Sequence, residues 1–398
     1  MRLMFSAINC VLDSSNGAAI SIRTFLRLLS QYGVECRSFT ASIYDRPAVG
    51  SALDNIEATG ARPVEEPGLP QTLWLGMDGD VRHYIEHTKG MRQSELSKEG
   101  QQRLFNRALA MLDAYKPDVL LLYGNREYER SMLMQARKRG IKTVFYLVNA
   151  GYKDITNFKH VDLIFTDTNA TRELFVERFN FNPRVIGKFI DKPVIPANAR
   201  AAEYVTFINP APIKGVTLFL RIVELAAQIV PSMKFLVVEN RSSLSDAEAR
   251  TGISMDRYRN VKRIGLQRDM GTVYAATRVL LAPSLWHDSG PRVSVEALSL
   301  GIPSVVSNRG GLPELVGDAG IVIDPPAPLV KDHWLVPPIS DAIPWVEALR
   351  SLLEDDEAYE SCRVAALAQW ARHDPALRLP GIVAALEELV AQPPAPAP

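Results

Sequence analysis

The sequence has few cysteines, no long apolar segment and no excess of charge of either sign. Three cysteines in 398 residues, Cys10, Cys36 and Cys362, are too few and too widely spaced for a disulfide framework or a metal quartet. No apolar run reaches the ~18 residues of a membrane-spanning helix. Lys+Arg and Asp+Glu are both 45, unlike the basic excess of nucleic-acid-binding domains. Disulfide-rich secreted and membrane-spanning classes are excluded, and we expect no nucleic-acid partner.

What the chain does contain is an ordinary globular composition, with 47% hydrophobic and 23% charged residues. Short runs rich in β-branched residues alternate with longer helical segments, which is typical of parallel sheets covered by helices. Residues 45–75 are rich in Pro and Gly, and we expect a loop or irregular insertion there. In the first half the pattern predicts strands at 3–9, 34–40, 119–123, 143–148 and 162–167, with helices at 18–32 and 94–115 and after Asn169.

The pattern stops at residues 191–200, which contain Pro193 and Pro196 and predict a linker. It restarts with strands at 204–208, 234–238, 261–265, 279–282, 303–307 and 320–323. We therefore predict an α/β fold of two Rossmann-like doubly wound domains, 1–190 and 201–374, that face a central cleft. A helix at 375–391 is expected to join the first domain, and 391–398 to form a flexible tail. Ligands of such sheets bind beyond the carboxyl ends of the strands.

The most informative segment is 282–324, APSLWHDSGPRVSVEALSLGIPSVVSNRGGLPELVGDAGIVID. Pro291 is suited to the first position of a helix, and the free N–H groups of a helix start suit a phosphate. Asp288 precedes this start and Glu296 lies just inside it, where a carboxylate can accept the two hydroxyls of a ribose. Local chemistry offers an alternative, in which Asp288 caps the helix and Glu296 pairs with Arg292 at four-residue spacing.

At these residues the chain resembles the retaining glycosyltransferases of family 4, which have the two-domain GT-B fold. The likeness rests on two acidic residues separated by seven, followed by a Gly-Pro turn and a Gly-Gly loop. Its residues are Asp288 and Glu296, 301–303, 310–314, 208–215, 263–265, 274–278 and Ser284, with a looser match where Asn16-Gly17 opens a helix. The resemblance implies transfer of a sugar from a nucleotide-diphosphate donor to an acceptor hydroxyl with retention of anomeric configuration.

The resemblance also implies a role for each matching residue. Lys214 is expected on the diphosphate, Asp288 on hydroxyls of the donor sugar, and Glu296 on the ribose. Lys214, Asp288 and Arg292 form the expected catalytic set. Further contacts with the nucleotide are implied for Gly17, Gly265, Leu266 and Gln267, and with the sugar and phosphates for Ser289, Gly290, Pro291, Asn209, Asn149 and His287.

Several positions depart from the family pattern. Asp288 is one methylene shorter than the usual Glu, and Asn209 replaces the Arg that shares the diphosphate with Lys214. Asn149 replaces a His that many relatives place near the sugar, and Asn cannot carry a proton. Arg292 stands where an apolar residue is usual, so we hypothesise that it replaces the missing positive charge; the alternative is a helix pair with Glu296.

Expected partners follow from this interpretation. The co-substrate is a nucleotide-diphosphate sugar, UDP- or GDP-linked, with no cofactor and, without an Asp-x-Asp triplet, no metal. The acceptor stays open among a glycan, a lipid-linked sugar, a protein and a small molecule. We expect a cytoplasmic location, with a peripheral position at the inner membrane face as an alternative. Glu314, after the Gly-Gly loop, is expected near the phosphates or as a cap of the next helix.

Two other functions stay open. A degenerate GT-B protein could bind a nucleotide sugar or a glycan without turnover, as the loss of the Arg at Asn209 suggests. A nucleotide-sugar epimerase of the same fold would need acid–base carboxylates and histidines, which the acidic pair here matches less well.

Overall fold

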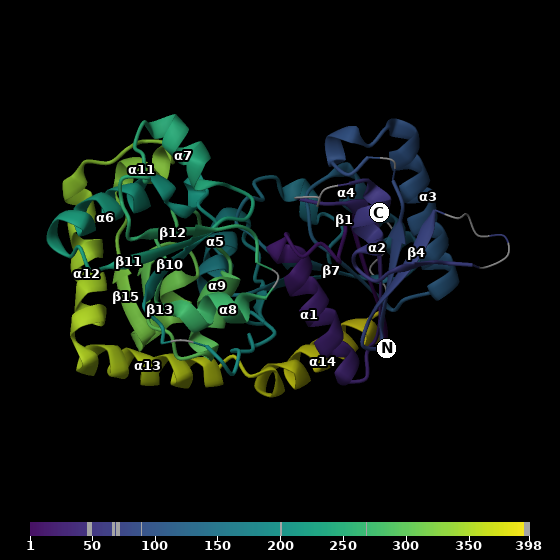
Figure 1. Cartoon of the computed structure of the whole chain (residues 1–398). Coiled ribbons are helices and arrows are strands. Elements are labelled where there is room, and N and C mark those ends of the chain that lie inside the picture. The colour runs from purple at the N-terminus through teal and green to yellow at the C-terminus, as the bar shows by residue number, and fades with distance from the viewer. Residues whose placement is uncertain are drawn as a thin grey trace. The chain divides into compact units, whose positions relative to one another are not determined.

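The computed structural model describes residues 1–398 except 46–49, 66, 67, 69–71, 89, 200, 268 and 394–398. The chain forms two compact units (Figure 1). Unit 1 comprises Met1–Asp167, Arg172–Phe189 and Pro375–Pro398, and unit 2 comprises Thr168–Thr171 and Ile190–Asp374. The segment expected to be a linker, 191–200, belongs to unit 2 over its described residues. Most of the expected tail, 394–398, lies outside the described residues.

Unit 1 is built on a sheet in the order β3-β4-β5-β2-β1-β6-β7-β8-β9. Its pairs are parallel except β3–β4 and β4–β5. The strands are β1 Arg2–Asn9, β2 Glu35–Ile43, β3 Arg62–Pro63, β4 Leu73–Asp78, β5 Val81–Glu86, β6 Val119–Leu122, β7 Lys142–Leu147, β8 Leu163–Thr166 and β9 Arg184–Val185. The helices are α1 Gly17–Gln31, α2 Ala52–Glu57, α3 Lys98–Tyr115, α4 Glu127–Lys138, α5 Asn169–Phe179 and α14 Pro375–Ala391.

The expected irregular insertion at 45–75 is more regular than its Pro and Gly content indicated. It contains α2, β3 and the first residues of β4. Ser51 and Asp54 form a capping box that starts α2, and this pairing satisfies two helix N–H groups at once. The antiparallel edge adds strands to a sheet that the first-half pattern predicted as parallel. The low strand propensity of Pro and Gly was overridden here by the pairing of β3 with β4 and of β4 with β5.

The core of unit 1 brings together segments that are far apart in the sequence. Phe25 of α1 stacks on Phe189 with ring centroids 5.8 Å apart. Ile382 and Leu386 of α14 belong to the same buried cluster as Phe25. Burial of each such side chain contributes about 1.5–3 kcal/mol, so α14 is part of unit 1's fold rather than an appendage.

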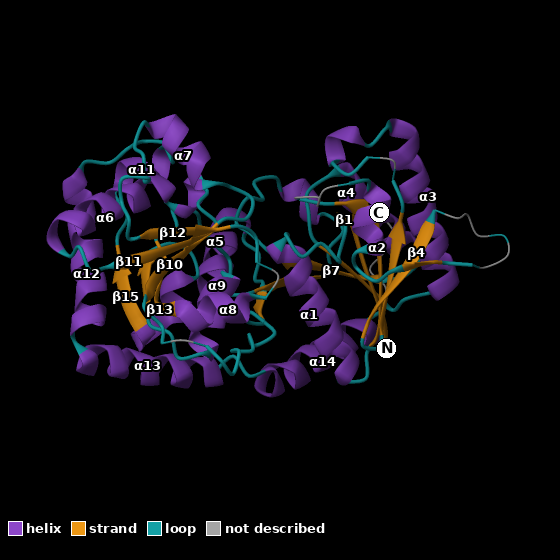
Figure 2. Cartoon of the chain, viewed as in Figure 1, coloured by secondary structure: helices purple, strands orange, loops and turns teal. Residues whose placement is uncertain are grey.

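Unit 2 is built on an entirely parallel sheet in the order β12-β11-β10-β13-β14-β15. Figure 2 shows these strands enclosed by helices. The strands are β10 Tyr204–Ile208, β11 Lys234–Val238, β12 Val261–Ile264, β13 Thr277–Ala282, β14 Ser304–Ser307 and β15 Gly320–Ile323. The helices are α6 Val216–Ile229, α7 Leu244–Thr251, α8 Met270–Ala276, α9 Arg292–Ser299, α10 Leu312–Val316, α11 Ala327–Lys331, α12 Ile343–Glu354 and α13 Asp356–Ala371.

The strand order of unit 2 reverses between β10 and β13. From β10 the chain moves outward through β11 to β12, then crosses back to β13 and continues outward to β15. Such a switch point leaves a crevice at the carboxyl ends of the two central strands, where ligands of open α/β sheets bind. The predicted α/β class with two Rossmann-like doubly wound domains is confirmed. No helix within the described ranges is long and apolar enough to cross a membrane.

Candidate functional site

The loops after β10 and β13 are joined at the carboxyl edge of the unit 2 sheet. The Ile213 carbonyl oxygen accepts hydrogen bonds from the backbone N–H groups of Leu285 at 2.9 Å and Trp286 at 3.2 Å. The Ser284 hydroxyl donates to the same oxygen at 3.4 Å, and the Ser307 hydroxyl, at the end of β14, donates to the Ser284 carbonyl. The residues that follow β10, β13 and β14, three neighbouring strands of the sheet, are therefore joined by hydrogen bonds at the switch point. We call this edge the rim.

The turn between β10 and α6 depends on two left-handed residues. Gly215 has φ +83°, and a Cβ there would lie 2.0 Å from the Pro283 carbonyl oxygen, so only glycine fits. Asn209 has φ +61°, a conformation that Asn tolerates better than most residues. Between them lies Lys214, in a short 3-10 turn. Sequence reasoning treated Asn209 as the replacement of a cation and as a contact of the donor sugar and phosphates, and it missed this backbone role.

The Lys214 ammonium group contacts Asp288 across the rim. Its Nζ donates to Oδ1 at 2.7 Å and to Oδ2 at 2.6 Å, and Ser284 donates to the same carboxylate at 3.0 Å. The two charged side chains are 26% and 16% exposed. The partial exposure leaves the ammonium group of Lys214 accessible to an anion from solution.

Glu296 is held by two donors at the start of α9. Oε2 accepts from the buried Tyr274 hydroxyl at 2.7 Å, and Oε1 accepts from Arg292 Nη2 at 2.9 Å. Burial first, and then the Glu296 carboxylate, raise the pKa of Tyr274 well above its usual value, so the hydroxyl stays protonated as a donor. The helix pair between Arg292 and Glu296, considered above as an alternative, is present. Tyr274 is a site residue to which sequence reasoning gave no role.

Three buried polar atoms at this edge have no hydrogen-bond partner among the described residues. They are Asn209 Oδ1, Asn240 Oδ1 and Arg292 Nη1. Asn209 follows β10, Asn240 follows the neighbouring β11, and Arg292 begins the helix after β13. Unsatisfied buried groups cost about 1–3 kcal/mol each and call for an explanation. Hydroxyl or N–H groups of a ligand would satisfy the two amide oxygens, and an anionic oxygen would satisfy the guanidinium nitrogen.

The N terminus of α9 carries no side-chain cap. Pro291, expected at the first helical position, instead occupies the N-cap position with φ −67°, and the helix begins at Arg292. Ser289 is buried, and its carbonyl oxygen accepts from the Thr168 hydroxyl at 2.7 Å. Gly290 lies between Ser289 and Pro291 in the sequence. The uncapped helix start supplies N–H groups and partial positive charge beside Asp288.

Two residues near this loop, His287 and Glu314, contact the segment that begins α5. His287 Nε2 lies 3.3 Å from the Thr171 hydroxyl oxygen. Glu314 caps α5 by accepting from the backbone N–H groups of Asn169 and Ala170, both at 3.0 Å. The N terminus of α10 has no side-chain cap, so the expected capping of the following helix is wrong, and Glu314 instead caps a helix that begins 145 residues earlier in the chain. Its expected position near the phosphates stays a prediction.

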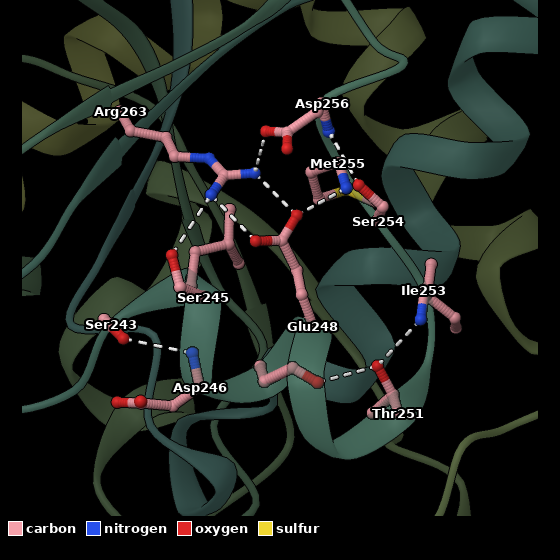
Figure 3. Close-up of polar contacts among 12 residues, drawn as sticks. Ser243, Ser245, Asp246, Glu248, Thr251, Ile253, Ser254, Met255, Asp256 and Arg263 are labelled. Atoms are coloured by element: carbon pink, nitrogen blue, oxygen red, sulfur yellow. Dashed lines mark hydrogen bonds and ion pairs between the residues drawn. The ribbon is translucent and has the colours of Figure 1, made fainter.

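The loop expected to contact the base, residues 265–267, follows β12. Gln267 Nε2 donates to the Gly265 carbonyl oxygen at 2.9 Å, and Leu266 is 40% exposed. β12 is tied to α7 by the Arg263–Glu248 pair, with two donors at 2.6 and 2.8 Å (Figure 3). This bidentate pair fixes the strand from which the loop emerges.

Two expected site residues belong to unit 1. Gly17 is the first residue of α1, whose N terminus is capped by Asn16 through the N–H groups of Ala18 at 2.9 Å and Ala19 at 3.1 Å. Asn149 follows β7, and its Oδ1 accepts from the Gly151 N–H at 2.8 Å. Both residues lie beyond the carboxyl ends of unit 1 strands and take part in local caps.

Comparisons with known proteins find a family match within unit 2. Residues 203–355 match the family model described as glycosyl transferases group 1. O-antigen chain mannosyltransferase B of Escherichia coli is 47% identical over 57 residues, which cover 14% of this chain and 15% of that protein. The aligned stretch thus spans well under two thirds of that curated relative.

Two solved structures match the fold across almost the whole chain. Sucrose-phosphate synthase of Thermosynechococcus elongatus aligns with a TM-score of 0.66 at 15% identity and covers 98% of this chain and 99% of its own. Anabaena HepE in complex with UDP-glucose aligns with a TM-score of 0.66 at 16% identity, covering 98% and 100%. Residues 203–355 thus match the glycosyl transferases group 1 domain, and the chain as a whole has the fold of GT-B glycosyltransferases.

Proposed function

We propose that this protein is a nucleotide-sugar-dependent glycosyltransferase that retains anomeric configuration. The observation that carries the proposal is the constellation at the unit 2 switch point. There an exchangeable lysine, an uncapped helix start and a fixed carboxylate follow adjacent parallel strands. The family match over 203–355 and the likeness to a fold that binds UDP-glucose in HepE support it. The donor we propose is a UDP- or GDP-linked sugar.

The diphosphate of the donor takes the place of Asp288 on Lys214. A diphosphate oxygen is a charged acceptor of the same kind as the carboxylate at 2.6–2.7 Å, so the exchange preserves a charge-assisted hydrogen bond. Asp288, once released, accepts hydroxyls of the donor sugar. Lys214 and the N–H groups at the start of α9 then stabilise negative charge on the departing diphosphate, because they already point where that charge develops.

Glu296 binds the ribose without losing its present partners. An ionised carboxylate offers about four lone-pair positions, and Tyr274 and Arg292 occupy one on each oxygen. The remaining positions accept the 2′- and 3′-hydroxyls. Because both oxygens are already held, little side-chain freedom is lost on binding, which favours affinity.

Arg292 supplies the positive charge that Asn209 lacks. Its Nη2 is paired with Glu296 and its Nη1 has no partner among the described residues, so the guanidinium can hold the helix pair and a phosphate oxygen together. The charge replacement and the helix pair with Glu296, considered as alternatives from the sequence, then hold at once, because different nitrogens of the Arg292 guanidinium take part in each. Asn209 instead offers an amide oxygen to a donor hydroxyl.

The role of Arg292 is tested by titrating UDP, GDP and the free nucleosides into Arg292→Ala. A phosphate contact predicts affinity for the diphosphate about tenfold weaker, with a smaller loss for the nucleoside, which loses only the support that Arg292 gives to Glu296. If Arg292 acted only by holding Glu296, nucleoside and diphosphate would weaken equally. A diphosphate affinity within twofold of wild type would contradict the charge replacement.

Retention follows because the acceptor oxygen attacks the anomeric carbon on the same face from which the leaving group departs. The bond from the anomeric carbon to the phosphate oxygen breaks, the acceptor oxygen bonds to that carbon on the same face, and the acceptor proton passes to the departing phosphate. Once the diphosphate holds Lys214, Asp288 keeps the Ser284 hydroxyl as a donor and accepts hydroxyls of the donor sugar, so we assign it to binding rather than to nucleophilic attack. The coupling constant of the anomeric proton in the product checks this stereochemistry.

The proposed function is tested by thermal unfolding against uridine, guanosine, adenosine and thymidine diphosphates and their common sugars. Ligand at a hundred times its dissociation constant adds about 2.7 kcal/mol. A shift with one base, followed by sugar transfer to a screened acceptor, supports the proposal. A shift without transfer or donor hydrolysis favours the second candidate, a binder without turnover, for which the substitution at Asn209 is the motivating observation.

A further inference from the structure

A pocket of unit 2, called here the amino-edge pocket, lies at the amino edge of the sheet, opposite the candidate site. It is open to solvent and has a volume of about 590 Å³. Its lining comes from the first residues of β10, β11 and β12 and from the loop before β12, away from the carboxyl-end loops that form the candidate site. The lining residues used below are Tyr204, Lys234, Arg257, Tyr258, Arg259 and Lys262.

The amino-edge pocket is strongly basic. Four of its lining residues are Lys or Arg and none is Asp or Glu. Two carboxylates lie beside it: Glu203 binds Lys234 at 2.6 Å, and Glu224 lies 3.5 Å from Arg257. Glu224 is bound more closely, at 2.5 Å, by Arg221 outside the pocket. The two neighbouring acids therefore leave the pocket with an excess of positive charge.

The two remaining cations have no ion pair within the part of the chain that the structure describes. Lys262 Nζ stands 5.9 Å from the centre of the Tyr204 ring, and its charge also acts on Glu203. Arg259 forms no ion pair with any residue that the structure describes. A guanidinium in this position presents several N–H donors in a fixed fork, which matches phosphate oxygens better than it matches water.

The walls of the amino-edge pocket are held in place. Arg257 lies over the Tyr258 ring at 5.0 Å, a cation–π contact that limits its motion. Asn260 Nδ2 donates to the Met233 carbonyl oxygen at 2.7 Å, and the Asn260 carbonyl oxygen accepts from the Phe235 N–H at 2.8 Å. The loop before β12 is thus tied to the strand β11 at both its backbone and a side chain.

We propose that the amino-edge pocket binds a phosphate-bearing anion, distinct from any donor at the carboxyl edge. Four cations line the pocket, two of them without an ion pair among the described residues, and no acid lines it. This excess of positive charge favours a multiply charged group over a single carboxylate. Two tyrosine rings add apolar and hydroxyl-bearing surface for the carbon part of such a ligand. The phosphate can belong to a soluble ester or to the headgroup of an anionic lipid.

The test uses the full chain with inorganic phosphate as the probe, titrated by calorimetry at fixed ionic strength. Three variants are compared with wild type: Arg259→Ser with Lys262→Ser in the pocket, Lys214→Ala at the carboxyl edge, and Lys331→Ser with Arg350→Ser as a matched surface control. In parallel, sedimentation with phosphatidylcholine vesicles, with and without phosphatidic acid, probes the lipid source. Circular dichroism checks that each variant is folded.

The proposal predicts binding at least tenfold weaker in the pocket variant and within twofold of wild type in the control pair. Retention of a phosphate-binding event in Lys214→Ala supports a second site for a soluble ester. Loss of phosphatidic-acid binding in the pocket variant alone supports the lipid source. The proposal is overturned if neither probe binds, if Lys214→Ala alone abolishes binding, or if the control pair weakens it equally.

Discussion

Tyr274→Phe removes one oxygen atom and tests whether Glu296 is held in place by its buried neighbour. The hydroxyl donates to Glu296 Oε2 at 2.7 Å, and Tyr274 is 2% exposed. A hydrogen bond to a charged group contributes about 1.5–3 kcal/mol, and its removal leaves a carboxylate oxygen without that donor. We expect unit 2 to lose about 2 kcal/mol in urea-induced unfolding.

A neutral hydrogen bond provides the matched control. The hydroxyl of Tyr128, which is also buried, lies 2.7 Å from the Ser6 hydroxyl, and such a bond is worth about 0.5–1.5 kcal/mol. Tyr128→Phe should therefore cost about half as much. A double-mutant cycle of Tyr274→Phe with Glu296→Gln isolates the pair, and we expect a coupling of about 1 kcal/mol. A loss under about 0.5 kcal/mol in Tyr274→Phe, with no coupling, would refute the reasoning.

Two further predictions concern the frame of the molecule. Gly215→Ala places a Cβ 2.0 Å from the Pro283 carbonyl oxygen at φ +83°, so it should cost more than about 2 kcal/mol in chemical unfolding; a cost under about 0.5 kcal/mol would contradict the turn described here. Burial lowers the pKa of His83 to about 3. Between that value and its ordinary 6.5, the unfolded chain therefore binds a proton that the folded chain does not. The free energy of unfolding should fall as pH decreases below about 6.5, by up to about 2 kcal/mol at pH 5. His83→Asn, which can keep the contact with Ser38, should remove that part of the pH dependence, and an unchanged profile would contradict it.

The central strands were predictable because short, nearly continuous apolar runs are typical of parallel strands that helices cover on both faces. β1, β6 and β10 were expected within two residues of their observed bounds. The antiparallel edge of unit 1 was not predictable, since β4 depends on pairing with β5 and β3 on pairing with β4 rather than on their own composition. The two-residue strand β9 is too short to leave a periodic signal.

The site was predictable where a motif places residues close together in the sequence, and not where contacts are long-range. The pairing of Arg292 with Glu296 follows from four-residue spacing, and it was considered. Contacts of Glu296 with Tyr274 and of Glu314 with Asn169 join residues 22 and 145 positions apart, and no local pattern announces them. The Lys214–Asp288 pair spans 74 positions; the resemblance indicated both residues but assigned them to a ligand, not to each other.

The central claim is that Lys214 and Asp288 exchange partners when the diphosphate of a donor binds. The most direct measurement is calorimetric titration of UDP and GDP into wild type, Lys214→Ala and Asp288→Asn. We expect at least tenfold weaker binding of the diphosphate in Lys214→Ala. In Asp288→Asn we expect a few-fold tighter binding of the free diphosphate, since the competing carboxylate is gone, but slower transfer from the nucleotide sugar. Binding of neither nucleotide to wild type, or unchanged affinity in Lys214→Ala, would contradict the account.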